Sequence, residues 1–596
     1  MALALLFSLL RARDPNIVIG DNPCGGAHAF VVDHKMRPES KNESLAVVTE
    51  LSKLDHIDAH RLELNWGRDD PASIKGIETA ARRLRYRALG SACVTYGVDA
   101  LLLGHHADDV HETVLMRLLR GQSGRGLRGT EPFNDIPECD GLHGLHKSGF
   151  LDIMRTNTPP LTYKQRRRDS LSLRRRLLDD MRSELRLWGD DTLEHLRPKR
   201  RRQPDDPDML DGVFADAAER LESPAARRAS LAQLDTEEGG VRVCRPFLGF
   251  AKERLVATCE AHGVRWFEDP TNADPALTER NAVRHVLRSA EVPVALRRPA
   301  ILDLAARVRA RVAAEEDEAD ALLGSTEVLD LRTNAGTMVV ELPDVQPGED
   351  PERSRTVAGL LLRRLMSAVS PEPQPPPLTS LQGAISRLFP ALATPAHPAS
   401  SPPSFPAASV LFTRLPAPTP RWHLSRAPYP STQPLPSIPL HQPKGMPNYG
   451  PMTRIKSHWA WKHRPWALFD GRFWLRLRLR LAGTVTLAPF RPEHAKAFRS
   501  ALPEADYRRL EQLLLAYAPG KVRWTLPAVY YEGALDVENG VATIGGTRTL
   551  LGLPSLDVRL PGSEKFVQWD VRYKKVDAGV LARCGMEVMP VTEHVL

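Results

Sequence analysis

The front of the chain alternates short apolar runs with longer amphipathic ones. The runs that predict strands lie at 27–34, 58–66 and 98–106, and those that predict helices lie at 1–13, 43–54 and 74–96. Gly97 follows the third helix in the position of a left-handed cap. This alternation predicts an α/β fold, a parallel sheet with helices on both faces. Ligands bind beyond the carboxyl ends of such strands, which is where His34 and His105 stand.

Length and proline content suggest how the chain is divided. The 596 residues could form roughly three to five domains of about 150 residues each. Between 371 and 450, 21 of 80 residues are proline, a density that predicts a disordered linker. We therefore expect an α/β domain at 1–300 with an insertion at about 150–239, a helical segment at 301–370, the linker at 371–450, and a C-terminal α+β domain at 451–596.

Positive charge is concentrated in two segments. The chain carries a net charge of +8, and the stretch from Lys164 to Arg202 alone holds 14 basic and seven acidic residues. This stretch is either a solvated insertion or a surface for RNA phosphates. From Phe469 to Leu481, apolar residues alternate with arginines, which predicts a half-exposed strand. Its basic face is either solvated or directed at RNA.

Several protein classes are excluded by composition. No apolar run reaches the length of about 18 residues that a membrane-spanning helix needs. The six cysteines contain no CxxC pair, which argues against a disulfide scaffold or a zinc ribbon and for a reducing compartment. Residues 1–13 lack the leading basic residues of a secretory signal, so we expect a helix of the fold there.

The strongest chemical signal is GHHADDVHET, from Gly104 to Thr113, where a strand meets a helix. If that helix begins near Ala107, then His105, Asp109 and Glu112 face one side of its first turn. Carboxylates in this position can hold Mg²⁺ on a substrate phosphate, or they can simply be capping charges. A zinc site lacks cysteine or a third spaced histidine. The following RLLRGQSGRGLRG supplies a flexible basic loop suited to phosphates.

At this point the sequence resembles the tRNA(Ile)-lysidine synthetase family of the PP-loop ATP pyrophosphatase superfamily. The blocks that carry the resemblance, in the order of the family, are FVVDHKMRPES, ETAARRLRY, GHHADDVHET, RLLRGQSGRGL, RPFLGFAK, and the pair WFEDPTNAD and ERNAVRHVL. They cover residues 1–287, interrupted by the basic insertion. The insertion and the divergent C-terminal half look more like a fungal member than a compact bacterial one.

The resemblance implies an ATP-dependent ligase. Such an enzyme adenylates the wobble cytidine of tRNA(Ile), and free L-lysine then displaces AMP to leave lysidine. By family position Asp109 would hold Mg²⁺, His105 would stand at the reacting centre, and Glu112 would attract the lysine ammonium. The remaining residues with implied roles are Arg82 and Arg245 on phosphate and adenylate, Val32, Asp33 and His34 beside adenine and ribose, and Arg120, Arg125, Arg128, Asn281 and Arg284 on tRNA.

One family feature has no counterpart in the sequence. The glycine-rich SGGxDS loop that cradles pyrophosphate is not present, and the chain opens with residues that resemble the helix after that loop. Either the chain begins downstream of the loop in a longer protein, which the other motifs favour, or it is an inactive, tRNA-binding relative. A tRNA thiolase of the same superfamily would need cysteines that the sequence does not offer. We expect a mitochondrial or, alternatively, a cytoplasmic location.

Overall fold

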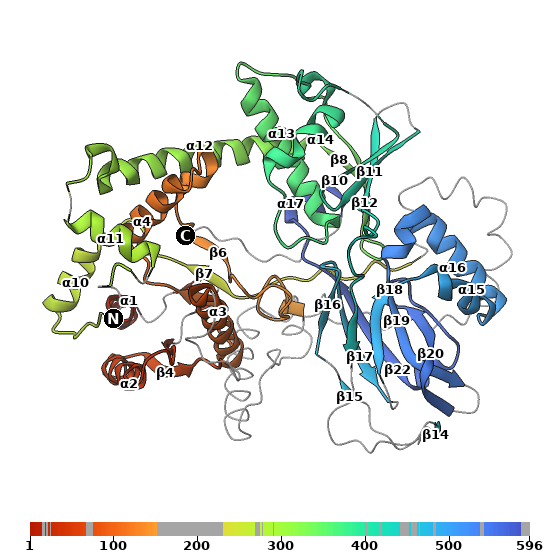
Figure 1. Cartoon of the computed structure of the whole chain (residues 1–596), viewed down its shortest axis with the longest axis horizontal. Coiled ribbons are helices and arrows are strands. Elements are labelled where there is room, and N and C mark those ends of the chain that lie inside the picture. Colours follow the sequence, from red (N-terminus) through yellow and green to blue (C-terminus); the bar gives the residue numbers. More distant parts are fainter. Residues whose placement is uncertain are drawn as a thin grey trace. The chain divides into compact units, whose positions relative to one another are not determined.

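The computed structural model describes most of the chain as two compact units (Figure 1). The described residues are 1–14, 18–19, 22–23, 26–66, 76–151, 231–268, 274–276, 278–289, 291–399, 402–416, 420–440, 452–454, 462–463, 465–480, 484–536 and 541–585. Of these, the residues up to 151 and those from 239 to 317 form the first unit, and 231–238 and 318–585 form the second. The basic stretch from Lys164 to Arg202 lies outside the described residues.

The first unit has the predicted alternation of strands and helices. Its elements are α1 (Ala2–Arg13), β1 (Val18–Ile19), β2 (Asn22–Pro23), β3 (Ala27–Asp33), α2 (Ser40–Leu51), β4 (Ile57–Glu63), α3 (Ile77–Tyr96), β5 (Ala100–Leu102), α4 (Ala107–Leu119), η2 (Gly124–Arg128), β6 (Phe133–Asp135), β7 (Arg242–Cys244), α10 (Lys252–Ala261), α11 (Glu279–Ser289), η5 (Val294–Leu296) and α12 (Arg298–Gly324), which continues into the second unit. Gly97 caps α3 with φ 69°, as predicted.

Helices cover both faces of the β3–β4 pair. The two strands are parallel and pair from Ala27 with Ile57 to Asp33 with Glu63. On one face, residues of α1 and α2 pack against them, including Phe7 and Leu51. The other face, with Phe30, packs toward α3. The α/β class with helices on both faces is therefore confirmed.

A second parallel pair contains β5, which lies within the predicted third strand, 98–106. β5 and β7 are parallel, with Leu102 opposite Cys244, and β6 adds to β7 in the antiparallel direction. Among the described residues, the β3–β4 pair and the β5–β7–β6 sheet are separate ladders. One apolar cluster joins them, because Val32 packs against the same buried core as Leu101 and Val243.

The second unit is mainly β. Its elements are β8 (Glu327–Arg332), β9 (Thr337–Glu341), α13 (Pro351–Val369), η6 (Leu378–Leu381), α14 (Gln382–Leu388), η7 (Pro390–Leu392), β10 (Ser404–Ala407), β11 (Val410–Leu415), β12 (Arg421–Arg426), β13 (Ile438–Leu440), β14 (Met452–Arg454), β15 (Lys462–His463), β16 (Ala467–Phe469), β17 (Phe473–Leu479), β18 (Val485–Pro489), α15 (Pro492–Ser500), α16 (Glu504–Tyr517), η8 (Gly520–Thr525), β19 (Pro527–Asp536), β20 (Val541–Leu553), η9 (Pro554–Leu556), β21 (Val558–Arg559), η10 (Ser563–Lys565), β22 (Val567–Tyr573) and α17 (Ala578–Arg583). The segment expected to be helical, 301–370, thus also contains the hairpin β8–β9.

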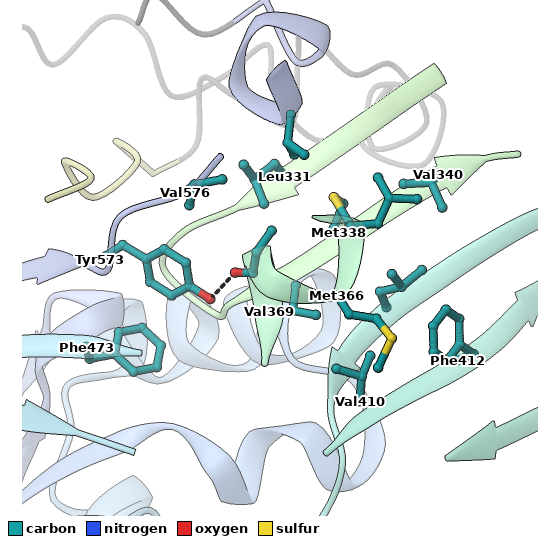
Figure 2. Close-up of a cluster of buried hydrophobic side chains, with 14 of the residues drawn as sticks. Leu331, Met338, Val340, Met366, Val369, Val410, Phe412, Phe473, Tyr573 and Val576 are labelled. Atoms are coloured by element: carbon teal, nitrogen blue, oxygen red, sulfur yellow. Dashed lines mark hydrogen bonds between the residues drawn. The ribbon is translucent and has the colours of Figure 1, made fainter. Parts of the chain in front are cut away.

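One large apolar core holds this unit together. It includes Met338, Met366, Phe412 and Phe473, which come from β9, α13, β11 and β17 (Figure 2). Within it, the hydroxyl of Tyr573 donates a hydrogen bond to the carbonyl of Ala368 at 2.8 Å. The phenol is fully buried, so this bond satisfies a donor that burial would otherwise leave unpaired.

The prediction of a disordered linker at 371–450 is wrong for the residues of this stretch that the structure describes. They form α14, β10, β11, β12 and β13, and Phe412 and Trp422 are buried in the core. The prolines occupy positions that tolerate them. Pro390 begins η7, and Pro406 and Pro439 lie on β10 and β13, which are edge strands of their sheets. A high proline content alone is therefore not sufficient to predict disorder in this region.

Within the described part of the chain, no helix is both long enough and apolar enough to span a bilayer.

Candidate active site at the carboxyl ends of β5 and β7

Helix α4 begins at Ala107, as the sequence predicted, and its first turn collects the polar side chains of the motif. His106 is the N-cap residue, and its backbone N–H donates to Asp109 Oδ2 at 3.0 Å. The imidazole lies between two carboxylates, 3.3 Å from Asp108 Oδ2 and 3.5 Å from Asp109 Oδ2. Burial acts to lower the pKa of His106, but these carboxylates outweigh it, and the pKa is raised.

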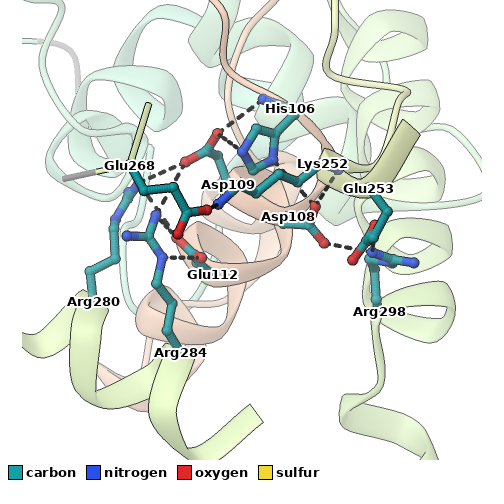
Figure 3. Close-up of polar contacts among 10 residues, drawn as sticks. All are labelled: His106, Asp108, Asp109, Glu112, Lys252, Glu253, Glu268, Arg280, Arg284 and Arg298. Atoms are coloured by element: carbon teal, nitrogen blue, oxygen red, sulfur yellow. Dashed lines mark hydrogen bonds and ion pairs between the residues drawn. The ribbon is translucent and has the colours of Figure 1, made fainter. Parts of the chain in front are cut away.

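Besides contacting His106, Asp108 binds two neighbouring helices. Its Oδ1 accepts from Arg298 Nη1 at 2.7 Å, and its Oδ2 accepts from the backbone N–H of Lys252 at 2.9 Å (Figure 3). The hydrogen bond with His106 and then the bond with Arg298 hold the pKa of Asp108 well below its usual range. Asp108 thus ties α4 to α10 and α12, which indicates a structural role.

Asp109 and Glu112 face two arginines of α11. Arg284 binds Glu112 through two bonds, Nε to Oε1 at 2.6 Å and Nη2 to Oε2 at 3.0 Å. Arg280 Nη1 lies 3.3 Å from Asp109 Oδ1 and 3.7 Å from Glu112 Oε2. Figure 3 shows both guanidinium groups directed at the two carboxylates. The structure therefore brings Asp109, Glu112 and Arg284 together, residues that lie about 170 positions apart in the sequence.

His105 and Arg245 follow adjacent parallel strands. The ladder of β5 and β7 continues as a parallel bridge between His106 and Phe247, and the charge of Arg245 acts on His105. Arg245 is buried and donates from Nη1 to the carbonyl of Glu131 and the amide oxygen of Asn134. Its Nε and the Nδ1 of His105 are buried atoms with no hydrogen-bond partner among the described residues.

The electrostatics of His105 favour a neutral ring. Burial lowers its pKa most, and the positive charges of Arg245, Arg280 and Arg85 lower it further, against the opposing effect of Asp109. A neutral imidazole can accept a proton near pH 7. The unpaired Nδ1 and the unpaired Nε of Arg245 thus form a polar spot that a bound group could satisfy.

Helix α3 carries Arg82, whose role on phosphate or adenylate stays a prediction, and a second arginine, Arg85, whose charge acts on the site. Arg82 is exposed, pairs with Glu138 at 3.3 Å and lies over the ring of Tyr86. Arg85, by contrast, is half-buried, and its charge acts on both His105 and Arg280. Helical spacing could have revealed it, because position 85 adjoins the buried stripe of Tyr86 and Leu89.

The basic loop after α4 is an ordered 3₁₀ turn, η2, rather than the flexible loop that the sequence predicted. Arg117 donates to the carbonyls of Gly126 and Gly129 and so holds it in place. Three of the four arginines expected on tRNA lie at the end of α4 or in η2, and each of these three has a carboxylate partner. These pairs are Arg120 with Glu279, Arg125 with Glu315 and Glu316, and Arg128 with Glu131. Their role in tRNA binding stays a prediction.

Asn281 forms hydrogen bonds with the turn before α11. Its backbone N–H donates to Thr278 Oγ1 at 3.1 Å, and its Nδ2 donates to the carbonyl of Asp274 at 2.9 Å. Asn281 is buried. These contacts position α11 and hence the arginines that face α4, whereas contact with tRNA stays a prediction.

A cavity of about 440 Å³ opens at the carboxyl ends of β3 and β4. Its lining residues are Lys35, Glu63, Leu64, Asn65 and Trp66. The residues that the sequence placed beside a nucleotide are not among those that line this cavity. Val32 packs into the core, Asp33 accepts hydrogen bonds from Ser40, Lys35 and Arg61, and the carbonyl of His34 accepts from the indole N–H of Trp66 at 2.8 Å. Its volume suits a nucleoside-sized ligand.

The donor set at α4 fits a hard divalent cation. The carboxylates of Asp109 and Glu112 lie on the same side of α4. The guanidinium groups of Arg280 and Arg284 occupy the position in front of them. Mg²⁺ is typically bound by one or two carboxylates, with water and substrate phosphates completing its shell. No group of three or more potential metal ligands occurs among the described residues, so any cation here would depend on ligands from outside this set.

The chain is similar in sequence to known proteins of one family. A family described as the PP-loop domain matches residues 3–189 and 220–291. A probable tRNA(Ile)-lysidine synthase of Schizosaccharomyces pombe is 27% identical over 261 residues, which are 44% of this chain and 37% of that protein. A tRNA(Ile)-lysidine synthase of Rhodopseudomonas palustris is 32% identical over 259 residues, 40% of this chain and 67% of that protein. One of Bradyrhizobium is 42% identical over 114 residues, 19% of this chain and 30% of that protein.

Proposed function

Because the chain belongs to the tRNA(Ile)-lysidine synthase family of PP-loop proteins, we propose that it forms lysidine at the wobble cytidine of tRNA(Ile). In the proposed reaction, the C2 oxygen of the cytidine attacks the α-phosphorus of ATP and releases pyrophosphate. The amine of free L-lysine then attacks C2, loses a proton, and releases AMP. The observation that carries the proposal is the grouping of His105, Arg245, Asp109 and Glu112 where β5 and β7 end.

The residues of this site suit those steps. Arg245 and Arg85 have no carboxylate within ion-pair distance among the described residues, so their charge is available to phosphate or adenylate. A neutral His105 can accept the proton that the attacking amine loses. Mg²⁺, held by Asp109 beside Glu112, would neutralise phosphate oxygens. We further propose that the cavity lined by Lys35 and Trp66 takes the nucleoside part of ATP.

The direct test measures lysidine. The chain would be incubated with a tRNA(Ile) transcript, ATP, Mg²⁺ and radioactive L-lysine, and label in the tRNA and released pyrophosphate would both be counted. We expect both products with the wild type. Arg245→Lys keeps the charge but loses the planar fork, and we expect kcat to fall by about 10²-fold, the usual effect of removing one oriented donor.

A matched control comes from α11. Arg288 is exposed in the last turn of that helix, and Arg288→Gln should leave the product yield near that of the wild type. Binding of tRNA with neither product would refute the catalytic proposal and favour a tRNA-binding relative. Sulfur transfer is not expected, because four of the five described cysteines are buried and burial raises the pKa of Cys93 to about 12. A mitochondrial location stays part of the proposal, which cell fractionation would test.

A further inference from the structure

The carboxylates proposed to face substrate cations already hold two cations of the protein. Both oxygens of Glu112 accept from Arg284, and Asp109 Oδ1 lies 3.3 Å from Arg280 and 3.7 Å from Arg284. The side chains of Glu112 and Asp109 are only 6% and 13% exposed. Uncompensated charge at that depth is costly, so each carboxylate needs a counter-ion whenever no substrate is present.

We propose that Arg280 and Arg284 are positioning residues that occupy this place, and that a divalent cation binds to Asp109 and Glu112 only by displacing their guanidinium groups. The inference rests on the proposed function, since it concerns the regulation of the same site. A metal ion and a guanidinium group cannot share the same oxygens without strong repulsion at such distances. Occupation by arginine and occupation by metal therefore exclude each other.

The surrounding packing allows the side chains to exchange without moving the helix. Val283 and Leu287 of α11 pack against the cluster that contains Val110 and Val114 of α4. These apolar contacts hold the helix in place while the flexible arginine side chains swing away. The displacement therefore requires rotamer changes in long side chains rather than the undocking of α11.

Displacement has a consequence for anions. Once they lose their carboxylate partners, Arg280 and Arg284 add their charges to those of Arg85 and Arg245, which together with Arg280 already act on His105. The phosphates of ATP are the anions that the proposed reaction supplies. Cation binding and phosphate binding then favour each other, and this coupling is reciprocal.

The test titrates the full 596-residue chain with Mn²⁺ alone, which is followed by electron paramagnetic resonance without nucleotide or tRNA. Arg284→Gln and Arg280→Gln remove the competing charges, and each should tighten Mn²⁺ binding by about tenfold or more, a factor that corresponds to about 1.4 kcal/mol. Arg288→Gln removes the same charge from an exposed position of the same helix and should change the affinity by less than about twofold.

Two further variants separate displacement from general electrostatics and from misfolding. Arg284→Lys keeps the charge but cannot form the two-bond contact with Glu112, so its Mn²⁺ affinity should lie between those of the wild type and Arg284→Gln. Arg280→Gln leaves the Arg284–Glu112 pair intact and serves if Arg284→Gln fails to fold, as judged by circular dichroism.

The outcomes are distinct from those of the lysidine assay. Equal Mn²⁺ affinity in the wild type, Arg280→Gln and Arg284→Gln would overturn the inference, and so would the absence of Mn²⁺ binding in all of them. Tighter binding in these two variants alone would support it even if no lysidine were formed, in which case only the proposed function would fail.

Discussion

A buried carboxylate in the second unit offers a sharp test of the electrostatic reasoning. Asp470 lies in the turn between β16 and β17 and faces two arginines. Arg472, which is fully buried, donates to Asp470 Oδ2 from Nε at 3.0 Å and from Nη2 at 2.8 Å, and Arg426 Nε lies 3.3 Å from the same oxygen. Asp470→Asn removes the only carboxylate that the described contacts give to these two guanidinium groups.

The magnitude follows from the burial of all three groups. Loss of one partner from a buried ion pair costs about 3–5 kcal/mol, because the remaining charge stays uncompensated. Here two charges remain, but an asparagine oxygen still accepts a hydrogen bond, so we expect a loss of unfolding free energy of about 3–5 kcal/mol. Backbone strain adds nothing, since Asp470 has φ 47° and asparagine tolerates the left-handed region.

The assay is urea unfolding followed by tryptophan fluorescence, with Asp557→Asn as the matched control. Asp557 also has a left-handed backbone, φ 51°, but it is exposed and lies 3.9 Å from Arg559. The same substitution there should cost less than about 0.5 kcal/mol. If Asp470→Asn costs no more than Asp557→Asn, the reasoning about buried charge in this unit is wrong.

Two further predictions concern backbone geometry and pH. Gly471→Ala should destabilise the second unit far more than Gly520→Ala, because both glycines have φ near 60° but only at Gly471 would a Cβ meet the carbonyl of Pro371, and parallel urea titrations would compare them. Burial, and then the charge of His28, lower the pKa of His60, so the unfolded imidazole binds protons more readily than the folded one. The unfolding free energy of the first unit should therefore fall as the pH drops below about 6.5, more steeply in the wild type than in His60→Asn, and equal slopes from about pH 7.5 to about 5.5 would contradict this.

The sequence predicted correctly those elements that short stretches of the chain define, such as helix ends and alternating strands. Helix α3 ends at Gly97 because glycine, which lacks a Cβ, adopts the left-handed conformation without strain, and α4 begins at Ala107, directly after its N-cap residue His106. In β17 the leucines are buried and Arg476 and Arg478 are half-buried, as strict alternation predicts. Periods of 2 and 3.6 residues and a helix cap can all be recognised within a window of about 18 residues.

The features that the sequence did not predict depend on distant partners. The contact between Arg284 and Glu112 joins positions 172 residues apart, so the motif, which predicted either Mg²⁺ ligands or capping charges, could not indicate this arginine partner. The same limit applies to the proline-rich region. Its strand β11 pairs with β12, and β12 pairs in turn with β9, which lies before the prolines in the sequence. The proline content of 371–450 is a local property of the sequence, whereas the strands in this region form by pairing with one another and with β9.

The arginine face of β17 shows how far such a pattern can be interpreted. Two hypotheses were open, a solvated face or one directed at RNA. In the structure Arg476 and Arg478 lie 3.1 Å and 3.6 Å from Asp570 on the neighbouring strand β22, and Arg476 also stacks over Trp466 at 4.7 Å. Part of the positive charge is thus already neutralised within the sheet. An RNA backbone would have to compete with that carboxylate, so charge counted along one strand overstates what the face can offer to a phosphate.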